Sequence, residues 1–488
     1  MGRAQAEQRE QPADRNRAMS RWSRWSRWSR WSRWLARRAW LPWLTTLILI
    51  AGAPWQLGEP NGDLYQYRCF ALAFWRGSAV AAHAAHCVGR LPSGAFPPLR
   101  VLPLEYPPLA LIPFSIPLLF GGAASVTAYV LAFNALMLVC LGATAWVIWR
   151  TDQCRSNPTH PIGATNATSL YLLWLALGAT TIALVRFDAL PALLTVIALL
   201  GAWRRPTRWP YALLALGTLL KLYPALLIVF LAIWDWRRAH ANDRHVADAA
   251  IHRAPHTDRY TWLLGPALAA GLLLLVQGAA DALTRQRGAP WLTVQSSRPP
   301  QIESTAAGLL WLWAVVTGRG GSIRAVSVQR SLAFVAAPGT LLARLTLALA
   351  LLAIAWAAWT LLRGHLAPVR AITGALLALL AGAAIFSPQY LLWASPLLAL
   401  ACWEAKTRQT SNTTDHKTQS WPPWHHGRHI ALAWTGACVL TTLIYSVGYL
   451  IALPAHTGAP LALFMVWVIA RDALVWYTAG ALLWPERI

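Results

Sequence analysis

The feature that most constrains this chain is its series of long apolar runs, many of which approach the length needed to cross a bilayer. A helix needs about 20 consecutive apolar residues to span the hydrocarbon core, and segments such as 339–362 and 460–484 meet this requirement. Hydrophobic residues make up 57% of the 488 residues and charged residues only 12%, against about 25% charged in soluble proteins. Because the alternating pattern of membrane β-barrels is missing, the sequence predicts an all-α polytopic integral membrane protein.

The positive charge of the chain lies between the apolar runs rather than within them. The formal net charge is +24, which in a soluble protein would suggest a nucleic-acid partner. Here Lys and Arg collect in short connecting segments, as they do in the cytoplasmic loops of membrane proteins. The sequence also lacks the basic and aromatic modules of nucleic-acid-binding folds. The charge therefore predicts orientation in the membrane, and no nucleic-acid partner is expected.

The most basic segment is the N-terminal tail, residues 1–38, which contains five consecutive Ser-Arg-Trp triplets at residues 20–34. With Trp at the interface and Arg on anionic headgroups, the repeat would form a juxtamembrane anchor. The favoured interpretation is a low-complexity expansion next to an alternative start at Met19. A cleavable signal peptide is not expected, because the first apolar run lacks a small-residue cleavage site.

Placing the basic connections on the cytoplasmic side gives about twelve spans with both termini inside. The decisive segment is 106–122, which is apolar but interrupted by four prolines and shorter than a full span. If it crossed the membrane, the basic loops that follow would lie outside, so it is expected to be an interfacial helix. A further interfacial helix is expected at residues 63–75.

This topology divides the chain into a few parts. They are the basic tail at 1–38, a main transmembrane region at 39–403, a polar cytoplasmic loop at 404–428 and a C-terminal pair of spans at 429–488, with long external loops at about 57–122 and 281–338. The expected spans cover roughly residues 39–56, 125–149, 168–185, 188–203, 208–221, 224–236, 260–280, 339–362, 370–386, 390–403, 430–453 and 460–484.

Polar residues that the apolar runs do not explain fall at the external ends of the spans. Ionisable groups at such positions are candidates for a functional site. The candidates are Asp63, Glu105, Tyr106, Arg186, Asp188, Lys221, Tyr223, Arg298, Gln301, Glu303, Ser387, Gln389 and Tyr390. The cations suit a phosphate-bearing ligand, and a carboxylate could accept the proton of an acceptor hydroxyl.

The central candidates also have purely structural interpretations. Arg186 and Asp188 lie two residues apart and could pair with each other as a clamp at the turn. Lys221 could extend to the external headgroups. Asp63 could simply begin a helix after the preceding Asn-Gly. These alternatives stay open at the level of the sequence.

The cysteines and histidines form no recognisable metal or redox motif. Six cysteines are scattered along the chain, and none belongs to a C-x-x-C pair. Cys69 and Cys87 share the first external loop, so a disulfide is possible there if the loop faces an oxidising compartment, but the geometry that decides it is not visible in the sequence. His83 and His86 are expected to be solvated, because no third ligand accompanies them. No metal site and no cofactor are predicted.

Five short segments, taken in order, resemble the motifs of glycosyltransferase family 87. They are "EYPPLAL" (105–111), "RFDALPALL" (186–194), "LLKLYPALL" (219–227), "RPPQIEST" (298–305) and "FSPQYLLWASPLLAL" (386–400). Members of this family are polytopic mannosyltransferases of the GT-C superfamily that use a polyprenyl-phosphate mannose donor. The resemblance covers roughly residues 60–400 and depends on the ordered set rather than on any single motif.

The resemblance implies a GT-C-like bundle with its site on the external face. The implied reaction is an inverting transfer of a hexose, with mannose favoured, from a polyprenyl-phosphate sugar donor to a hydroxyl of a lipid or glycan acceptor. Asp63 would be the general base, and Arg186, Lys221 and Arg298 would hold the donor phosphate. The residues expected to orient the donor or acceptor sugar are Glu105, Tyr106, Asp188, Tyr223, Gln301, Glu303, Ser387, Gln389 and Tyr390.

One departure from the family pattern lies in the first external loop. Residues 78–98 form an insertion containing Ala and His where the family more often has a short stretch, so the acceptor or the donor could differ from mannosyl chemistry. The main alternative function is a secondary transporter or lipid flippase, which would need a polar path through both leaflets. The internal ends of the spans show only basic loops, so an enzyme of the inner cell membrane with an external, periplasmic site is favoured.

Overall fold

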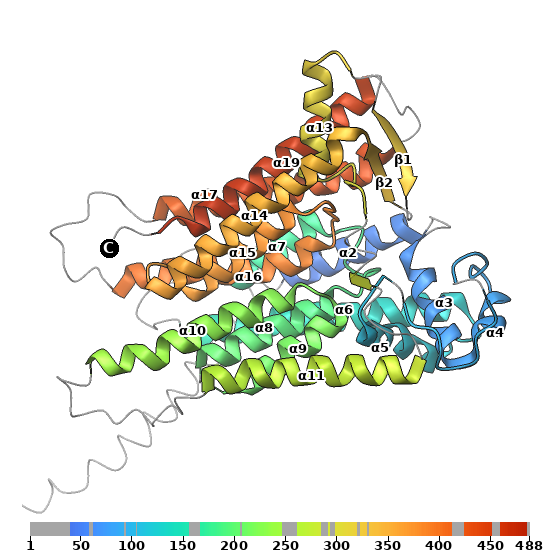
Figure 1. Ribbon diagram of the computed structural model, residues 1–488, viewed down its shortest axis with the longest axis horizontal. Coiled ribbons are helices and arrows are strands. Elements are labelled where there is room, and N and C mark those ends of the chain that lie inside the picture. Colours follow the sequence, from blue (N-terminus) through green and yellow to red (C-terminus); the bar gives the residue numbers. More distant parts are fainter. Residues whose placement is uncertain are drawn as a thin grey trace, which may run out of the picture.

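The structure is a computed structural model, and it describes most of the chain after the N-terminal tail. The described residues are 40–57, 62–91, 94–103, 105–155, 166–204, 207–245, 261–284, 291–292, 298–319, 323–328, 331–411, 424–450 and 459–485. Within these residues the chain is almost entirely helical (Figure 1). The prediction of an all-α polytopic membrane protein is confirmed. The Ser-Arg-Trp triplets lie outside the described residues.

Each expected span coincides with a helix. These helices are α2 (Trp40–Leu57), α6 (Val126–Arg155), α7 (Ala167–Gly178), α8 (Ala189–Arg204), α9 (Trp209–Leu220), α10 (Pro224–His245), α11 (Thr261–Thr284), α14 (Ala337–Arg363), α15 (Pro368–Gly382), α16 (Tyr390–Ser411), α17 (Trp424–Leu443) with its π-helical continuation η4 (Ile444–Gly448), and α19 (Ala459–Leu483). Among the described residues, five helices are long and apolar enough to cross a membrane by length and composition, namely α6, α11, α14, α17 with η4, and α19.

Several helices of the bundle are too short to cross a bilayer by themselves. Helices α7 and α9 have 12 residues each and α15 has 15, which at about 1.5 Å per residue gives roughly 18–23 Å against a hydrocarbon core of about 30 Å. The predicted third span was therefore too long, because α7 ends at Gly178 and residues 179–188 continue as turns. Similarly, α15 ends at Gly382 rather than at residue 386.

Local sequence and tertiary packing both contribute to these early ends. Pro224 and Pro388 follow α9 and α15 within a few residues, and proline cannot continue a helix from the preceding turn. At Gly178 a Cβ atom would lie within 2.7 Å of the Leu391 side chain and 2.8 Å of Cys438, so glycine allows the end of α7 to pack closely on α16 and α17. The non-helical segments that follow α7, α9 and α15 are consequently recessed into the bundle.

The predicted first external loop contains short helices at one end of the bundle (Figure 1). They are α3 (Asp63–Arg76), α4 (Ser78–Ala82), η1 (Pro108–Ala110), α5 (Leu111–Ser115) and η2 (Ile116–Phe120). The helix predicted at 63–75 is present. Residues 106–122 form three consecutive short pieces, because the prolines remove backbone donors and fix the local dihedrals.

The second external loop contains elements that the sequence analysis had not assigned. Helix α13 (Thr305–Val316) is followed by an antiparallel hairpin of β1 (Arg324–Val328) and β2 (Ser331–Val335). Both lie at the same end of the bundle as the first loop (Figure 1). Gln301 forms a bridge to Ala333 of β2, so the hairpin is attached to the segment that enters α13.

A buried aromatic group connects the first loop to the turn after α7. The ring of Tyr67, on α3, stacks on Phe114 of α5 with centroids 4.2 Å apart and meets the edge of Phe187 at 5.6 Å. All three side chains are fully buried, and aromatic pairs of this kind contribute about 0.5–1.5 kcal/mol beyond their buried area. This packing places the start of α3 beside the turn that carries Arg186 and Asp188.

Candidate active site

Asp63 is the first residue of α3, and its carboxylate forms an ion pair with Arg186 in the turn after α7. Both side chains are 20% exposed, so the pair is neither sealed nor fully solvated. The negative charge also lies in the first helical turn, where the helix dipole favours it. Asp63 therefore both begins a helix and contacts a second predicted site residue.

Lys221 and Asp188 form the second pair. The Lys221 Nζ lies 3.1 Å from Asp188 Oδ1, and the same carboxylate oxygen accepts a 2.7 Å hydrogen bond from Trp393 Nε1. Lys221 is thus held inside the site, and the interpretation that it extends to the headgroups is wrong. Burial lowers the pKa of Lys221 from its usual value, and the Asp188 carboxylate opposes this shift.

Aromatic rings surround the Lys221 ammonium. Its Nζ lies 4.7 Å from the ring centroid of Phe187, 5.1 Å from that of Tyr106 and 5.5 Å from that of Trp393. A cation near several ring faces gains electrostatic stabilisation. The predicted site residue Tyr106 therefore contributes its ring to the surroundings of a predicted phosphate-binding cation.

Trp393 and Phe187 are site residues that the sequence analysis missed. Trp393 stacks on Tyr223 at 4.3 Å and contacts Tyr390 at 4.3 Å, so it connects two predicted residues to Asp188. The available signal was its position three residues after Tyr390, which places both side chains on one face of α16. Phe187 lies between Arg186 and Asp188 in sequence, and its apolar character concealed its contact with the cation.

Arg298 and Glu105 form the third pair and join the two external loops. Their Nη2 and Oε2 atoms are 3.5 Å apart, with 13% and 25% of the side chains exposed. The charges of Arg186, Asp188 and Arg298 all lie within electrostatic range of Tyr390, which places the three pairs in one region. We call this group the outer cluster. It consists of Asp63, Glu105, Arg186, Asp188, Lys221 and Arg298.

The outer cluster draws most of its residues from one continuous segment. Residues 104–242 match the model of glycosyltransferase family 87. This segment includes Glu105, Arg186, Asp188 and Lys221 of the outer cluster. The match confirms the resemblance for the motifs at 105–111, 186–194 and 219–227 and supports a membrane glycosyltransferase. No curated protein and no solved structure matches the chain.

The predicted polar residues of the 301–304 and 387–390 segments lie outside the family 87 match and form separate contacts. Ser387 donates a short hydrogen bond to Gln389 Oε1, and the Gln301 backbone N–H donates to Ala384 O at 2.8 Å. Glu303 is fully buried. These contacts join the second external loop to the segment after α15.

A second group of charged residues lies around the middle of α19. Arg471 Nε donates to Asp472 Oδ1 at 2.8 Å, and Arg471 Nη2 donates to the backbone carbonyl of Glu303. Tyr445 donates to Glu303 Oε1 at 3.1 Å, and Thr305 donates to Asp472 Oδ2 at 3.3 Å. These five residues are called the α19 cluster below.

The sequence analysis assigned only Glu303 of the α19 cluster. The missed signal was the Arg471–Asp472 pair inside the last apolar run, since ionisable residues at such depth are functional candidates. The guanidinium carbon of Arg471 lies 4.2 Å from the centroid of the Phe386 ring, which connects the cluster to the 386–390 segment. Burial raises the pKa of Glu303 to about 8, against the opposing charge of Arg471.

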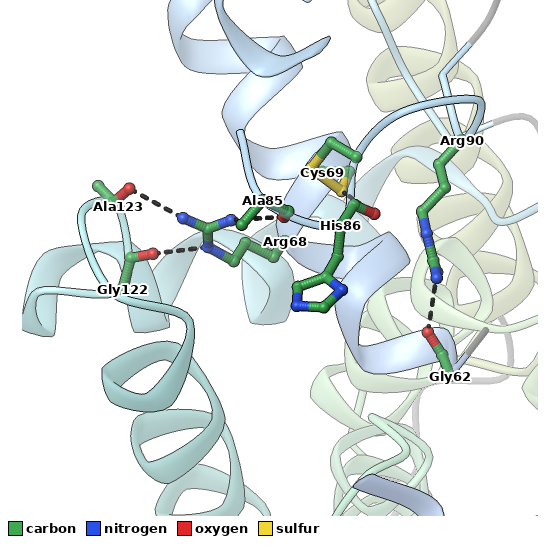
Figure 2. Close-up of a disulfide and its surroundings, with 9 residues drawn as sticks. Gly62, Arg68, Cys69, Ala85, His86, Arg90, Gly122 and Ala123 are labelled. Atoms are coloured by element: carbon green, nitrogen blue, oxygen red, sulfur yellow. Dashed lines mark hydrogen bonds between the residues drawn. A yellow bond between two sulfur atoms is a disulfide. The ribbon is translucent and has the colours of Figure 1, made fainter. Parts of the chain in front are cut away.

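The first external loop is closed by a disulfide between Cys69 and Cys87, whose Cα atoms are 5.4 Å apart (Figure 2). The conditional prediction of this bond is met. Next to it, Arg68 donates to the carbonyls of Gly122 and Ala123 at 2.9 and 3.1 Å. Figure 2 shows this guanidinium between α3 and the turn before α6. The disulfide therefore closes the loop on itself, and the Arg68 side chain connects α3 to the turn before α6.

The described residues form no cluster of metal-binding side chains. Among them, no three His, Cys, Asp or Glu side chains gather into a group that could hold a metal ion. His86 instead stacks on Tyr65, with ring centroids 4.7 Å apart. Each carboxylate of the outer cluster forms an ion pair with an Arg or Lys side chain.

Proposed function

We propose that the protein transfers a hexose, with mannose favoured, from a polyprenyl-phosphate sugar to a hydroxyl of a lipid or glycan acceptor, with inversion at the anomeric carbon. The observation that carries this proposal is the Asp63–Arg186 pair within the outer cluster. A carboxylate that can accept a proton lies against a cation that can hold a phosphate. Two further cations lie in the same region, Lys221 from the recessed segment after α9 and Arg298 from the segment before α13.

The proposed step balances as follows. The acceptor oxygen forms a bond to the anomeric carbon while the bond between that carbon and the phosphate oxygen breaks. The electron pair of the broken bond stays on the polyprenyl phosphate, and the proton of the acceptor hydroxyl goes to Asp63. Attack opposite to the leaving phosphate inverts the configuration. Arg and Lys side chains provide the positive charge that the leaving phosphate requires.

The charge arrangement of the outer cluster supports this step. Its three carboxylates and three cations balance one another, and a polyprenyl-phosphate sugar adds one negative charge. Proton transfer neutralises Asp63 at the moment when the leaving phosphate gains charge. Arg186 can then turn from the neutral acid to the phosphate. The same guanidinium would thereby restrain the base before the reaction and stabilise the leaving group during it.

The aromatic surroundings support binding of a sugar and a phosphate together. Tyr106, Tyr223 and Tyr390 are predicted sugar-orienting residues that pack around Lys221 or Trp393. Their rings provide flat apolar surfaces, and their hydroxyl groups can bond to sugar hydroxyls. We assign Gln301, Glu303, Ser387 and Gln389 to the walls of the same site.

We place this site on the external face of the inner cell membrane, with both termini in the cytoplasm. The Cys69–Cys87 disulfide lies in the first loop next to Asp63, and disulfides persist mainly in oxidising compartments. The basic connections at the opposite ends of the spans agree with this orientation. Two independent properties, redox chemistry and loop charge, therefore support the same side.

The test is the Asp63→Asn variant, assayed in membranes with a labelled polyprenyl-phosphate mannose and native lipid acceptors. Asparagine keeps the size of the side chain but cannot take the proton, so we expect transfer to fall by at least about 10²-fold. Asp281→Asn is the matched control. Asp281 lies near the external end of α11, where it accepts a hydrogen bond from Gln277, and transfer is expected to be unchanged.

Two results would overturn the proposal. If Asp63→Asn retains wild-type transfer, Asp63 is not the base. If wild-type membranes show no transfer from the labelled donor but move a solute or lipid across the bilayer, a transporter or flippase is the better interpretation. Comparing the glycolipids of a deletion strain with those of its parent then identifies the acceptor, because the sugar-bearing product disappears.

A further inference from the structure

The insertion in the first external loop folds against the helix that begins with Asp63. Within it, residues 83–91 follow α4, contain Cys87 of the disulfide and are called the disulfide loop below. The Arg68 guanidinium also donates to the carbonyl of Ala85 in this loop at 3.3 Å. The loop is therefore held to α3 by adjacent residues of the helix, Arg68 and Cys69.

The contacts of the disulfide loop follow one face of α3. Arg90 Nη1 donates to the carbonyl of Gly62 at 3.2 Å, and the His86 ring stacks on Tyr65. Together with the Cys69–Cys87 bond, these contacts engage positions 62, 65 and 69. Such positions, three and four residues apart, lie on one face of a helix. Figure 2 shows Arg90 reaching Gly62 before the start of α3 and the disulfide farther along the helix at Cys69.

The start of α3 needs a contact from elsewhere in the chain. Its N-cap residue is Gly62, which has no side chain to bond to the free backbone N–H groups of the first turn. Ser, Thr, Asp or Asn at this position would provide such a cap. Arg90 leaves these N–H groups as they are, but its guanidinium donates to the Gly62 carbonyl and so holds the residue that precedes the helix, and charge-assisted hydrogen bonds are stronger than neutral ones.

We propose that the disulfide loop fixes the position of the base, and that Arg90 is a positioning residue for Asp63. Gly62 and Asp63 share a peptide bond, so holding the Gly62 carbonyl limits the movement of the Asp63 backbone. On its other side, Asp63 is held by Arg186. This inference depends on the proposed function, because it assumes that Asp63 is the base. It assigns a role in catalysis to the insertion at residues 78–98, where the chain departs from the family pattern.

The expected effect follows from the geometry of proton transfer. A general base must lie within hydrogen-bond reach of the hydroxyl that it deprotonates, and a displacement of about 1 Å can lower the rate by about 10²-fold. Arg90 itself does not contact the substrate in this scheme. Its loss should therefore lower kcat and leave the KM for the donor unchanged.

The test compares Arg90→Met with Arg90→Lys in the full-length protein. Methionine keeps length and apolar contact but removes the donor, and we expect a roughly 10–100-fold fall in kcat. Lysine can still donate to the Gly62 carbonyl and should restore most of the activity. Arg76→Met is the matched control, because Arg76 is exposed at the opposite end of the same helix.

The disulfide gives a second, reversible test. Treating the wild-type protein with a reductant should lower kcat to a similar extent, and reoxidation should restore it. The Cys69→Ala/Cys87→Ala double variant should show the lower activity from the outset and no response to reductant. A full wild-type response to reductant in this double variant would show that another bond or site is responsible, which would overturn the assignment.

Hydrogen exchange measured by mass spectrometry separates this inference from the proposed function. Peptides covering residues 62–70 should exchange faster in Arg90→Met and in the reduced wild type, while peptides of α6 remain unchanged. The positioning role is overturned if exchange at residues 62–70 is unchanged in both Arg90→Met and the reduced wild type. It is also overturned if Arg90→Met raises the KM for the donor and leaves kcat unchanged. If exchange changes as expected but the wild type transfers no sugar, the structural inference stands and the proposed function fails.

Discussion

The outer cluster and the α19 cluster contain similar chemical groups in different surroundings. Both combine carboxylates with arginine or lysine, the outer cluster mostly at helix ends and the α19 cluster around the middle of α19. In the outer cluster the pairs of Asp63 and Glu105 leave 13–25% of each side chain exposed, whereas Arg471 and Asp472 are 0% and 4% exposed. A sealed ion pair cannot change partners without a large desolvation cost, but a partly exposed pair can.

This difference indicates separate tasks for the two clusters. In the proposed function the outer cluster receives a phosphate and releases a carboxylate, which the partial exposure of the Asp63–Arg186 and Glu105–Arg298 pairs allows, whereas Asp188 is fully buried. The α19 cluster holds the loops that carry Gln301, Glu303 and Ser387, since it binds the Glu303 carbonyl and packs on the ring of Phe386. The exposed fraction of a charged side chain is therefore a better guide to its function than its position along the membrane normal.

The largest expected effect is the loss of folding in Arg471→Met. Removing one partner of a buried ion pair leaves Asp472 uncompensated, which typically costs about 3–5 kcal/mol. We expect low yield and a much lower melting temperature in detergent, with Arg344→Met, at an exposed arginine of α14, as the control. If Arg471→Met is as stable as the wild type but inactive, the α19 cluster acts on substrate and the division of tasks is wrong.

The next effect concerns activity rather than stability. Arg186→Gln removes the cation that pairs with Asp63, and we expect kcat/KM for the donor to fall by about 10²-fold. Because both side chains are partly exposed, the free energy of unfolding should change by no more than about 1 kcal/mol. A large fall in melting temperature with near-normal transfer would show that the outer cluster is structural.

The order of the spans was readable from the sequence because hydrophobic length and loop charge are local properties. The broken segment at 106–122 was predicted for the same reason, since its prolines are visible without a structure. The ends of α7 and α15 were not predictable in this way. An apolar sequence such as "TTIALV" continues a hydrophobic run whether it is helical or not, so tertiary packing decides where the helix ends.

The residues of the outer cluster could be named in advance, but their pairing could not. Arg186 and Asp188 are close in sequence, yet the structure joins Arg186 to Asp63 and Asp188 to Lys221. These partners are far apart along the chain, and only the packing of Tyr67 on Phe114 and Phe187 brings them together. Trp393 was missed because a tryptophan in an apolar helix gives no sign that its N–H bonds to a buried carboxylate.

A smaller effect should appear in the pH dependence of stability. The pKa of Glu303 is raised by burial from 4.5 to about 8, so between these values the folded protein keeps a proton that the unfolded chain loses. Stability should therefore fall as the pH rises from about 4.5 to 8, by at most about 1.4 kcal/mol per pH unit. In Glu303→Gln the melting temperature, measured in detergent from pH 5 to 8, should vary less. An equally steep profile in this variant would assign the dependence to another group.

The smallest effect is expected for Arg298→Lys, which tests how open the outer cluster is. Arg298 and Glu105 are 3.5 Å apart and partly exposed, so lysine can keep the charge and loses mainly the planar geometry of the guanidinium. We expect a change of only a few-fold in the KM for the donor, and none in the melting temperature. Arg298→Gln should be clearly worse, because it removes the charge as well. If lysine and glutamine are equally damaging, Arg298 recognises its ligand through a bidentate contact, and this part of the outer cluster is built as rigidly as the α19 cluster.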